Sequence, residues 1–528
     1  MGRSVMNFGR TLTNTALRYP DRVAVVWGAK HTTYQELNDR VNRLAASFAD
    51  LGLVIGDRVA LAMPNRPEYL EVFFSCFKGG FCVVPLDARF KRQEIAYHIR
   101  DCRAKAVVYS SELAEQIALA GEELESITHL VAVGDGPKLD VHGAQSHGYE
   151  SLLMESASRD CKERSVEVDP DHVCWLFYTS GTTGRPKGAM LTHGNLQFVT
   201  LAWLADLMQL NPEDVTLHAA PLSHGAGFHA IVSIARGCRQ VLPEHVNFNP
   251  DAILELIESE QVTNTWLVPT QIKRLVFAPS LPQRHLSKLH SIVYGGAPFH
   301  VADLKNALQA LGPILIQIYG QGETPMTITY LPKSEHMLAL RNPDFEARLA
   351  SAGYARTGVE VRIVDSDDKA VPPGELGEIV VRGPSVMKGY WERPEDSAHT
   401  LRGGWLHTGD IGRMDDRGYV YIVDRAKDLI ITGGANVYAR EVEEVLLCHS
   451  GVRAVAVIGI PDRDWGERVV AVVVPEPSNP PTADELIRYC GARIASYKKP
   501  KQVEFLDELP VSNYGKVLKR ELRARFAT

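Results

Sequence analysis

Residues 178–188 have the composition of a loop that binds phosphate. They read YTSGTTGRPKG and stand at the end of the apolar run CWLFY, which predicts a strand leading into a loop. Glycines let the backbone turn and bring its N–H groups close to an anion, while hydroxyl groups and Lys187 add donors and positive charge. The residues expected to hold phosphate are Thr179, Ser180, Gly181, Thr182, Thr183, Gly184 and Lys187.

Two other interpretations of this loop compete with phosphate binding. A Walker A loop needs Gly-Lys followed by Ser or Thr, but Lys187 follows Pro186 and precedes Gly188, which excludes that motif. A plain flexible surface loop would not need several hydroxyl groups and a lysine together. Phosphate binding is therefore the favoured interpretation.

The longer stretch YTSGTTGRPKGAMLTHGN resembles the signature of the adenylate-forming superfamily. That superfamily includes acyl-CoA synthetases, adenylation domains of peptide synthetases and firefly-type luciferases. The resemblance spans nearly the whole chain, and further motifs follow in the family's order. It implies an AMP-forming acid–CoA ligase that uses ATP, Mg²⁺ and coenzyme A: a carboxylate attacks the α-phosphorus of ATP, and a thiol then displaces AMP from the acyl-adenylate.

Three further motifs of the resemblance imply a nucleotide site. YGQGE looks like the family's YGxTE, which implies that Tyr319 stacks on adenine and that Glu323 is catalytic and binds magnesium. Gly322 replaces the family's usual threonine, so a hydroxyl group that touches the α-phosphate is missing. YGGAP resembles the adenine-side loop, and WLHTGD supplies Asp410 for the ribose hydroxyls. The set implied around the nucleotide is Gly295, Gly296, Ala297, Pro298, Tyr319, Gly320, Gln321, Gly322, Glu323, Asp410 and Arg425.

The C-terminal motifs imply a second domain that rotates to complete the site. VDRAKD places Lys427 at the family's hinge, and SNYGK places Lys516 at its catalytic lysine. One orientation of the domain would present Lys516, and the other would open the path for the thiol. The residues implied near the thiol path and the nucleotide of CoA are Gly433, Gly434, Lys499 and Lys501.

The acid is not identified by the sequence. Amino-acid-activating domains carry an aspartate shortly after the PLSH region, whereas this chain has no acidic residue there before Glu244, so a non-amino acid is favoured. His224 is equally consistent with a structural role and with a catalytic contact to the carboxylate, and Thr182 joins the catalytic candidates through the phosphate loop. Fatty, alicyclic and aromatic acids all remain open for the implied pocket of His224, Phe228, Val268, Thr270, Tyr294, Gln321 and Met326.

Two alternatives to a CoA ligase stay open. The acceptor of the adenylated acid could be a carrier protein, an amine or oxygen, and dependence of AMP release on a thiol separates these cases. A nucleotide-binding scaffold without catalysis is the other alternative, but Lys516 and Glu323 are both present.

The elements that position these residues alternate between strands and helices. TYQELNDRVNRLAASFADLG predicts an amphipathic helix with a capping box of Thr33 and Glu36, and DRVALAMP, FCVVPLD and AKAVVYSS predict strands, which favours a parallel α/β fold. Short β segments follow from about residue 353. We expect a large α/β domain with a β-rich subdomain over residues 1–424 and a small mobile α+β domain over residues 425–528.

Composition excludes several classes of protein. The 528 residues are 45% hydrophobic and carry a net charge of −7, which disfavours a nucleic-acid-binding protein. No apolar stretch is long enough to cross a bilayer, and because MGRSVMNFGR has no apolar core after its arginines, we do not expect a secretory signal. We expect a cytoplasmic enzyme with small-molecule substrates and a possible homodimer.

Overall fold

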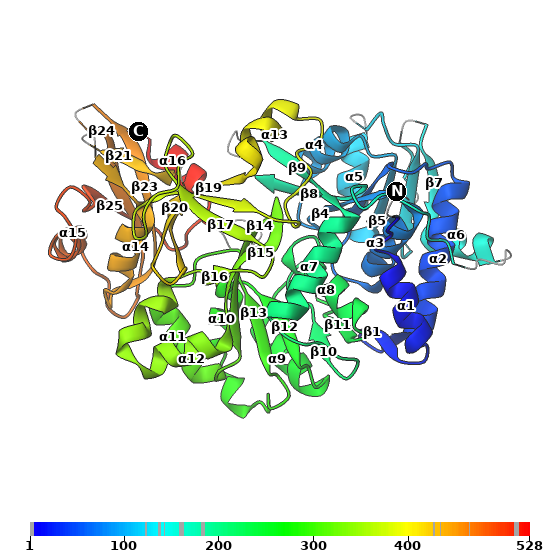
Figure 1. Cartoon of the computed structure of the whole chain (residues 1–528), viewed down its shortest axis with the longest axis horizontal. Helices are drawn as coiled ribbons and strands as arrows, with labels where there is room; N and C mark the ends of the chain where they lie inside the picture. The colour runs from blue at the N-terminus through cyan, green and yellow to red at the C-terminus, as the bar shows by residue number, and fades with distance from the viewer. Residues whose placement is uncertain are drawn as a thin grey trace.

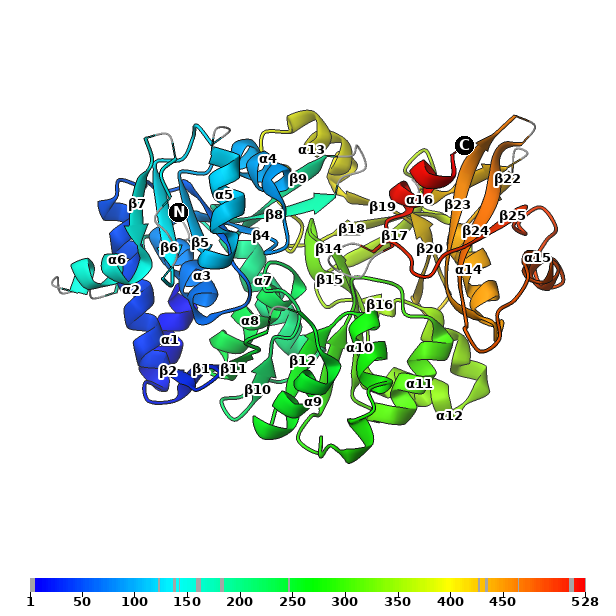
Figure 2. The same ribbon diagram turned by 180° about the vertical axis from the view of Figure 1, so that it is seen from behind.

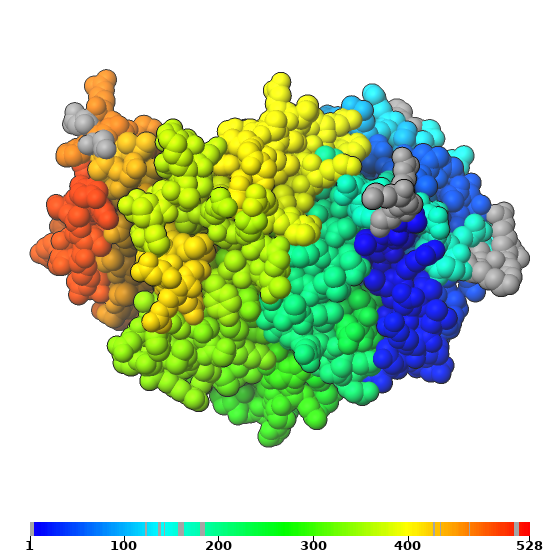
Figure 3. Space-filling model, in the orientation of Figure 1, coloured from blue at the N-terminus to red at the C-terminus, as the bar shows by residue number. Residues whose placement is uncertain are grey.

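The computed structural model describes residues 5–121, 124–135, 139–141, 143–157, 163–180, 185–245, 247–425, 428–432, 435–463, 465–511 and 517–527. Within this part, the chain forms four sheets and the helices that cover them. The N-terminal half lies at one end of the molecule and the C-terminal residues form a lobe at the other (Figures 1 and 3).

The first sheet is parallel except at one edge. Its order is β7-β6-β5-β3-β4-β8-β9, and only the β8–β9 pair is antiparallel. The strands are β3 (Arg58–Ala62), β4 (Cys82–Leu86), β5 (Ala106–Ser110), β6 (His129–Val133), β7 (Gln145–Gly148), β8 (Val173–Ser180) and β9 (Pro186–Thr192). The helices that cover it are α2 (Tyr34–Asp50), α3 (Pro67–Gly79), α4 (Arg92–Cys102), the 3₁₀ helix η1 (Ser111–Leu113), α5 (Ala114–Ala120) and α6 (Tyr149–Ala157).

The second sheet is the centre of the large domain. Its order is β16-β15-β14-β13-β12-β10-β11-β1-β2, with parallel pairing from β14 to β1 and antiparallel strands at both edges. The strands are β1 (Val23–Trp27), β2 (Lys30–Thr33), β10 (Val215–Leu217), β11 (Arg239–Leu242), β12 (Asn264–Leu267), β13 (Ser291–Tyr294), β14 (Leu315–Gln321), β15 (Thr324–Leu331) and β16 (Tyr354–Ala355). Its helices are α1 (Arg10–Arg18), α7 (His193–Asp206), α8 (Gly225–Ala235), α9 (Pro250–Ser259), α10 (Pro269–Val276), η3 (Leu281–Gln283), α11 (Val301–Leu311), α12 (Lys333–Arg341) and η4 (Pro343–Ala350).

Two smaller sheets complete the chain. The third is antiparallel, with β17 (Glu360–Val364), β18 (Gly377–Arg382), β19 (Leu406–Met414) and β20 (Val420–Arg425), and α13 (Pro394–Thr400) and η5 (Arg402–Gly404) lie between β18 and β19 in the chain. The fourth contains β21 (Ile430–Thr432), β22 (Ala435–Val437), β23 (Val452–Asp462), β24 (Gly466–Pro475) and β25 (Gln502–Phe505), with α14 (Ala439–Leu447), α15 (Ala483–Gly491) and α16 (Lys519–Phe526). The change of sheet therefore falls just after Arg425, beside the expected domain boundary.

Side-chain alternation explains how the second sheet serves two cores. On β12, Trp266 joins the core that also holds α8, whereas Leu267 joins the core under α9, α10 and α11. Helices α7 and α8 lie between the first and second sheets in both views (Figures 1 and 2). The predicted α/β class is confirmed, as is the helix capped by Thr33 and Glu36, which is α2. Within the described ranges, no helix is long and apolar enough to span a membrane.

Candidate active site

A cavity of about 2300 Å³ lies where strand ends of the large domain meet the C-terminal lobe. The ends of β8 and β14 supply Thr179 and Tyr319 to its lining, the middle of β19 supplies Asp410, and α16 of the C-terminal lobe supplies Lys519. Ligands of open α/β sheets bind at such strand ends, because the chain there leaves the sheet as loops with free polar groups. The cavity brings the separate motifs of the sequence into one site.

Glu323 lies in a turn between β14 and β15 and is held by two hydroxyl groups. Its Oε1 accepts hydrogen bonds from Thr179 Oγ1 and from Tyr390 Oη, each at 2.8 Å, and the residue is buried. Burial first, and then the Glu323 carboxylate, raises the pKa of Tyr390, so this phenol stays a donor. Thr179 at the end of β8, a residue of the expected phosphate loop, therefore donates directly to Glu323, the carboxylate expected to bind the metal.

Lys187 stands at the start of β9, on the other side of that loop. It is buried, its Nζ pairs with Asp396 Oδ1 of α13 at 2.8 Å, and it lies 5.3 Å from the ring centroid of Tyr390. The cation therefore sits beside the Glu323 group and is balanced by one carboxylate.

Asp410 on β19 is the centre of a second polar group. Its Oδ2 accepts from Tyr319 Oη at 2.6 Å and from Gln321 Nε2 at 2.7 Å, and its Oδ1 pairs with Arg425 Nε at 3.1 Å. The Asp410 charge raises the pKa of Arg425, while burial first and then Asp410 raise the pKa of Tyr319. All four side chains are therefore fixed before any ligand binds.

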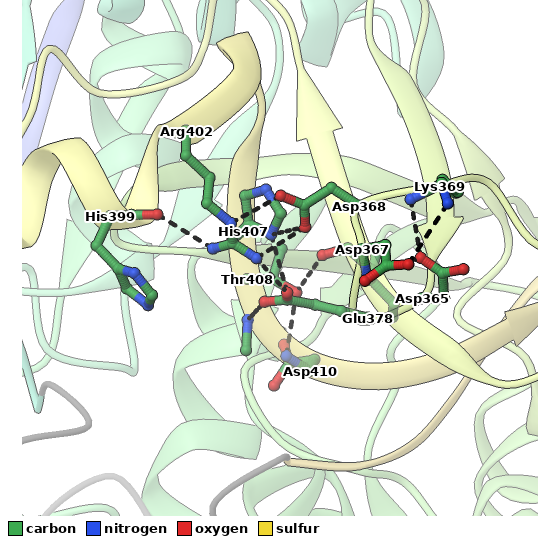
Figure 4. A network of polar contacts seen from close by, with 12 residues as sticks. Asp365, Asp367, Asp368, Lys369, Glu378, His399, Arg402, His407, Thr408 and Asp410 are labelled. Carbon is green, nitrogen blue, oxygen red and sulfur yellow. Dashed lines mark hydrogen bonds and ion pairs between the residues drawn. The ribbon is translucent and has the colours of Figure 1, made fainter.

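An irregularity of β19 before Asp410, where its pairing with β18 shifts register, sets the direction of this carboxylate (Figure 4). Gly409 has a φ of +69°, and its N–H donates to Glu378 Oε1 at 2.9 Å. The N–H of Asp410 donates to Thr408 Oγ1 at 3.1 Å, and Glu378 Oε2 also lies 2.8 Å from His407 Nδ1. The left-handed conformation at position 409 favours glycine, and the Glu378 carboxylate holds this part of β19 in place.

Gly322 leaves no space for the threonine that the family resemblance suggests. A Cβ at this position would overlap Thr179 Cγ2 and lie 2.5 Å from Cδ1 of Phe177. The Thr179 methyl group and the Phe177 ring therefore fill the volume that a side chain at position 322 would take. Thr179, whose methyl group occupies this space, directs its own hydroxyl to Glu323.

The other end of the cavity is lined by aromatic rings. Phe177 lies 5.6 Å from the rings of both His224 and Phe228, and Phe228 stacks on Trp175 at 4.5 Å. Trp266 closes the pocket between helix α8 and the loop after β13, because a Cβ at Gly225 would lie 2.6 Å from its Cζ2. Val268, Thr270, Gly296 and Met326 complete this apolar end.

His224 lies at the N-terminus of α8, where the polar and apolar ends meet. Its Nδ1 lies 2.8 Å from Ser223 Oγ, and its ring meets Phe177 edge to face. Position and hydrogen bond both suit a contact with the carboxylate of an acid.

The structure places two expected residues elsewhere. Tyr294 was expected in the acid pocket, but it lies on the opposite face of β13, where its hydroxyl lies 2.9 Å from His336 Nε2. Alternation along β13 is the reason, because Val293 takes the face toward the core that holds Trp266 and Tyr294 takes the other face. Gly295 is packed with its Cα against Ile318, where a Cβ would lie 2.5 Å from the Ile318 carbonyl oxygen, so the loop contributes to the cavity only from Gly296 onward.

Other expected residues lie outside the described part of the chain or away from the cavity. Outside the described part are Gly181, Thr182, Thr183, Gly184, Lys427, Gly433, Gly434 and Lys516. Lys501 lies over the Trp465 ring, 2.8 Å from its centroid, and Lys499 packs near Gly491; both are on the C-terminal lobe and neither lines the cavity. Val511 and Val517, which flank the segment of Lys516, do line it.

Comparison with known proteins places this site in a family. The model described as AMP-binding enzyme matches residues 12–391, and the model of the AMP-binding enzyme C-terminal domain matches residues 441–516. The chain is a member of the AMP-binding enzyme family. The predicted membership of the adenylate-forming superfamily is thereby confirmed.

Individual members of the AMP-binding family resemble the chain over its whole length. A feruloyl-CoA synthase of an Amycolatopsis species is 40% identical over 509 residues, which cover 96% of each chain. The medium/long-chain-fatty-acid–CoA ligase FadD8 of Mycobacterium tuberculosis is 35% identical over 536 residues, 99% of this chain and 91% of the relative. The structure of the anthranilate CoA ligase AuaEII with anthranoyl-AMP superposes with a TM-score of 0.88 at 26% identity, covering 99% of this chain and 97% of that one.

A magnesium ion fits the polar end of this AMP-binding enzyme. Glu323 offers a buried carboxylate that, among the described residues, accepts hydrogen bonds from the neutral hydroxyl groups of Thr179 and Tyr390. Among the described residues, no cluster of three or more His, Cys, Asp or Glu side chains could hold a metal by itself. A single carboxylate suits Mg²⁺, which binds through one or two carboxylates and the phosphates of its nucleotide.

Motif reasoning missed the residues that shape the acid end of this AMP-binding enzyme. Phe177 and Trp266 carry no motif, yet each stands two positions before an expected cavity residue: Phe177 precedes Thr179 on β8, and Trp266 on β12 precedes Val268, which follows the end of that strand. That period-two spacing was the available signal.

Proposed function

We propose that this AMP-binding enzyme joins a planar aromatic carboxylic acid to coenzyme A. The reaction is that of an AMP-forming acid–CoA ligase: ATP and the acid give an acyl-adenylate and pyrophosphate, and the CoA thiol then displaces AMP. The ligase class agrees with the CoA synthases and ligases among its relatives. The proposed partners are therefore the acid and CoA, and a homodimer stays a prediction.

The aromatic acid is favoured by one observation, the pocket built from Phe177, Trp266 and Phe228. Flat rings on several walls offer stacked and edge-to-face contacts to an aryl ring, each worth about 0.5–1.5 kcal/mol beyond burial. Trp266 also packs against Gly225, and we infer that its ring limits the room for an extended chain on this side. The feruloyl-CoA synthase relative is named for an aromatic acid, whereas FadD8 is named for fatty acids. The relatives therefore do not decide the class of acid, and the proposal rests on the shape of the pocket.

The first half-reaction joins two anions and needs positioning and charge neutralisation more than covalent help. We assign the triphosphate to the loop after Thr179 and to Lys187, and the ribose hydroxyls to Asp410. The carboxylate of the acid would lie at His224, in line with the α-phosphorus. Magnesium held by Glu323 would neutralise charge on the phosphates.

The charges of the site determine what must move when ATP binds. Lys187 is paired with Asp396, so a phosphate group that takes this cation must replace that carboxylate. Asp410 must accept ribose hydroxyls while it keeps the Arg425 and Tyr319 contacts that fix it. Lys516 is proposed as the cation that meets the carboxylate and the α-phosphate.

The test is pyrophosphate release from ATP and magnesium across a panel of acids, with and without CoA. The panel contains ferulate, cinnamate, benzoate, indoleacetate, cyclohexanecarboxylate and straight-chain acids from short to long. We expect the largest kcat/KM with an arylpropenoate or arylacetate, with AMP and an acyl-CoA as products. A preference for long straight-chain acids would contradict the proposed acid, and AMP release that is indifferent to CoA would contradict the acceptor.

A further inference from the structure

Met326 has the most unusual backbone in the acid pocket. Its φ is +58°, and of the described non-glycine residues with positive φ it alone is buried; the exposed ones are Arg103, Gln261, Asp368 and Glu392. Such a conformation costs about 1–3 kcal/mol for a residue with a Cβ and persists only where surrounding contacts enforce it. Met326 stands near the start of β15, where the pairing with β14 shifts register.

A buried arginine holds the strained residue in place. Arg356 Nη1 donates to the carbonyl oxygen of Met326 at 2.8 Å, and Nη2 donates to the carbonyl oxygen of Ala202 at 2.6 Å. Arg356 Nε pairs with Asp206 Oδ2 at 2.7 Å, and the two side chains are 1% and 4% exposed. The guanidinium fork thus ties β15 to the end of α7, which lies beside it in Figures 1 and 2.

Asp206 is fixed from the other side. Its carboxylate accepts from the N–H of Thr357 at 3.1 Å and from Thr357 Oγ1 at 2.6 Å. None of Arg356, Asp206 and Thr357 lines the cavity. This group therefore cannot touch the acid.

The held residue does face the acid. Met326 lines the cavity, and its Cε would lie 2.8 Å from a Cβ at Gly225, on the side where Trp266 also closes the pocket. Its backbone N packs tightly against Gly320, at a position where no Cβ would fit. A change in the backbone of Met326 must therefore change the width of the pocket between Met326 and Trp266.

We propose that the Arg356–Asp206 pair is a positioning clamp that sets acid selectivity through Met326. The clamp holds the left-handed turn of Met326, and the turn aims the thioether at the space that the aryl ring takes. This inference rests on the proposed function, because selectivity has meaning only for an enzyme that activates acids.

The alternative is a buried ion pair that only stabilises the fold. Replacing such a pair by apolar side chains of similar volume is often neutral or stabilising, whereas removing one partner leaves a buried charge. The double variant R356L/D206L therefore removes the clamp and leaves no orphan charge. The matched control is R40L/E71L, which removes the Arg40–Glu71 pair between helices α2 and α3; neither residue lines the cavity.

The experiment measures kcat and KM for ferulate, benzoate and a medium-chain fatty acid in both double variants, with circular dichroism as the check of folding. We expect R356L/D206L to change the ratio of kcat/KM between ferulate and the fatty acid by about tenfold or more, since a small change of fit in an apolar pocket has effects of this size. The KM for ATP should stay within about twofold. The control should keep the wild-type ratio.

Two further variants, R356K and M326G, test the clamp independently of the double variant. R356K keeps a cation for Asp206 but loses the fork that reaches two carbonyl groups, so an intermediate selectivity is expected. M326G adopts a positive φ without strain and has no side chain to aim. Removing the clamp in the M326G background should therefore leave selectivity unchanged, which a merely stabilising pair does not predict.

Three results separate the possibilities. Unchanged selectivity in folded, active R356L/D206L and R356K overturns the clamp. Independent, multiplying effects of M326G and clamp removal overturn it as well, because the clamp would then act through another residue. A wild-type enzyme that releases no pyrophosphate with any acid overturns the proposed function instead, and selectivity plays no part in that result.

Discussion

The two ends of the cavity are built on different principles. At the nucleotide end, Glu323 and Asp410 are buried carboxylates, each fixed by neighbouring hydroxyl, amide or guanidinium groups before any ligand arrives. At the acid end, Phe177, Trp266 and Met326 form a surface shaped by side-chain volume. In the proposed function, the first end recognises the nucleotide by directed polar contacts, and the second recognises the acid by fit.

The comparison explains why the ends should respond differently to mutation. Polar groups aimed at developing charge act on every substrate alike, whereas a wall of the pocket acts on the difference between substrates. Changes at the nucleotide end should lower all rates together, and changes at the acid end should reorder the acids.

Glu323→Gln should have the largest effect. It removes the negative charge proposed to hold magnesium while the amide keeps the shape of the side chain, and we expect kcat for adenylation to fall about 10²–10³-fold for every acid. Acid-dependent ATP–pyrophosphate exchange measures this step. The control Tyr390→Phe removes one hydroxyl donor to the same carboxylate and should cost far less. A fall in the adenylation rate with only some of the acids would contradict the assignment of Glu323 to the nucleotide end.

Trp266→Ala should have the next largest effect, and it should change the kinetics with the acid but not the KM for ATP. It opens the pocket beside Gly225 and Gly296, and we expect kcat/KM for ferulate to fall about a hundredfold while longer acids gain relative to it. Steady-state kinetics with varied acid and varied ATP check this. An equal loss for every acid, or a large rise in the KM for ATP, would show that Trp266 supports the nucleotide end.

Gly322→Ala tests the boundary between the ends and should have a smaller effect. The added Cβ overlaps the Thr179 methyl group and presses on Phe177, so we expect about a tenfold fall in kcat/KM. Thr179→Ser removes that methyl group and keeps the hydroxyl donor to Glu323, so G322A/T179S should recover part of the activity. Full activity of G322A alone would mean that the volume beside Gly322 is free.

Thr408→Ala should have the smallest effect, at the nucleotide end alone. It removes the acceptor for the Asp410 N–H and a donor to the Ile379 carbonyl oxygen, which loosens the irregular part of β19 before Asp410. A net hydrogen bond of about 1 kcal/mol predicts a rise of about fivefold in the KM for ATP. The ratios between acids should stay as in the wild type, and a reordering of acids would contradict the assignment of Asp410 to the nucleotide.

The sequence predicted the nucleotide end far better than the acid end. Thr179, Tyr319, Glu323 and Asp410 stand in short motifs because polar contacts to one ligand need particular side chains at fixed positions, and the structure brings all four to one cavity. Their individual roles stay predictions. The fold class was also predictable, since strand and helix periodicity is local.

The acid end was not predictable in the same way, because fit depends on which face of a strand a residue takes. Tyr294 belongs to a motif but points to the other core, while Trp266 belongs to none and closes the pocket. The reason for Gly322 also needed three dimensions, since Thr179 and Phe177 of β8 fill its space from a distant part of the chain. Arg356 reaches Met326 in the same non-local way.

The most direct test of the two-ended cavity is a crystal structure with a stable sulfamate analogue of the feruloyl adenylate. We predict that the ribose hydroxyls bind Asp410 and that the aryl ring contacts Trp266, Phe177 and Met326. An aryl ring bound outside that pocket, or a ribose away from Asp410, would contradict the account.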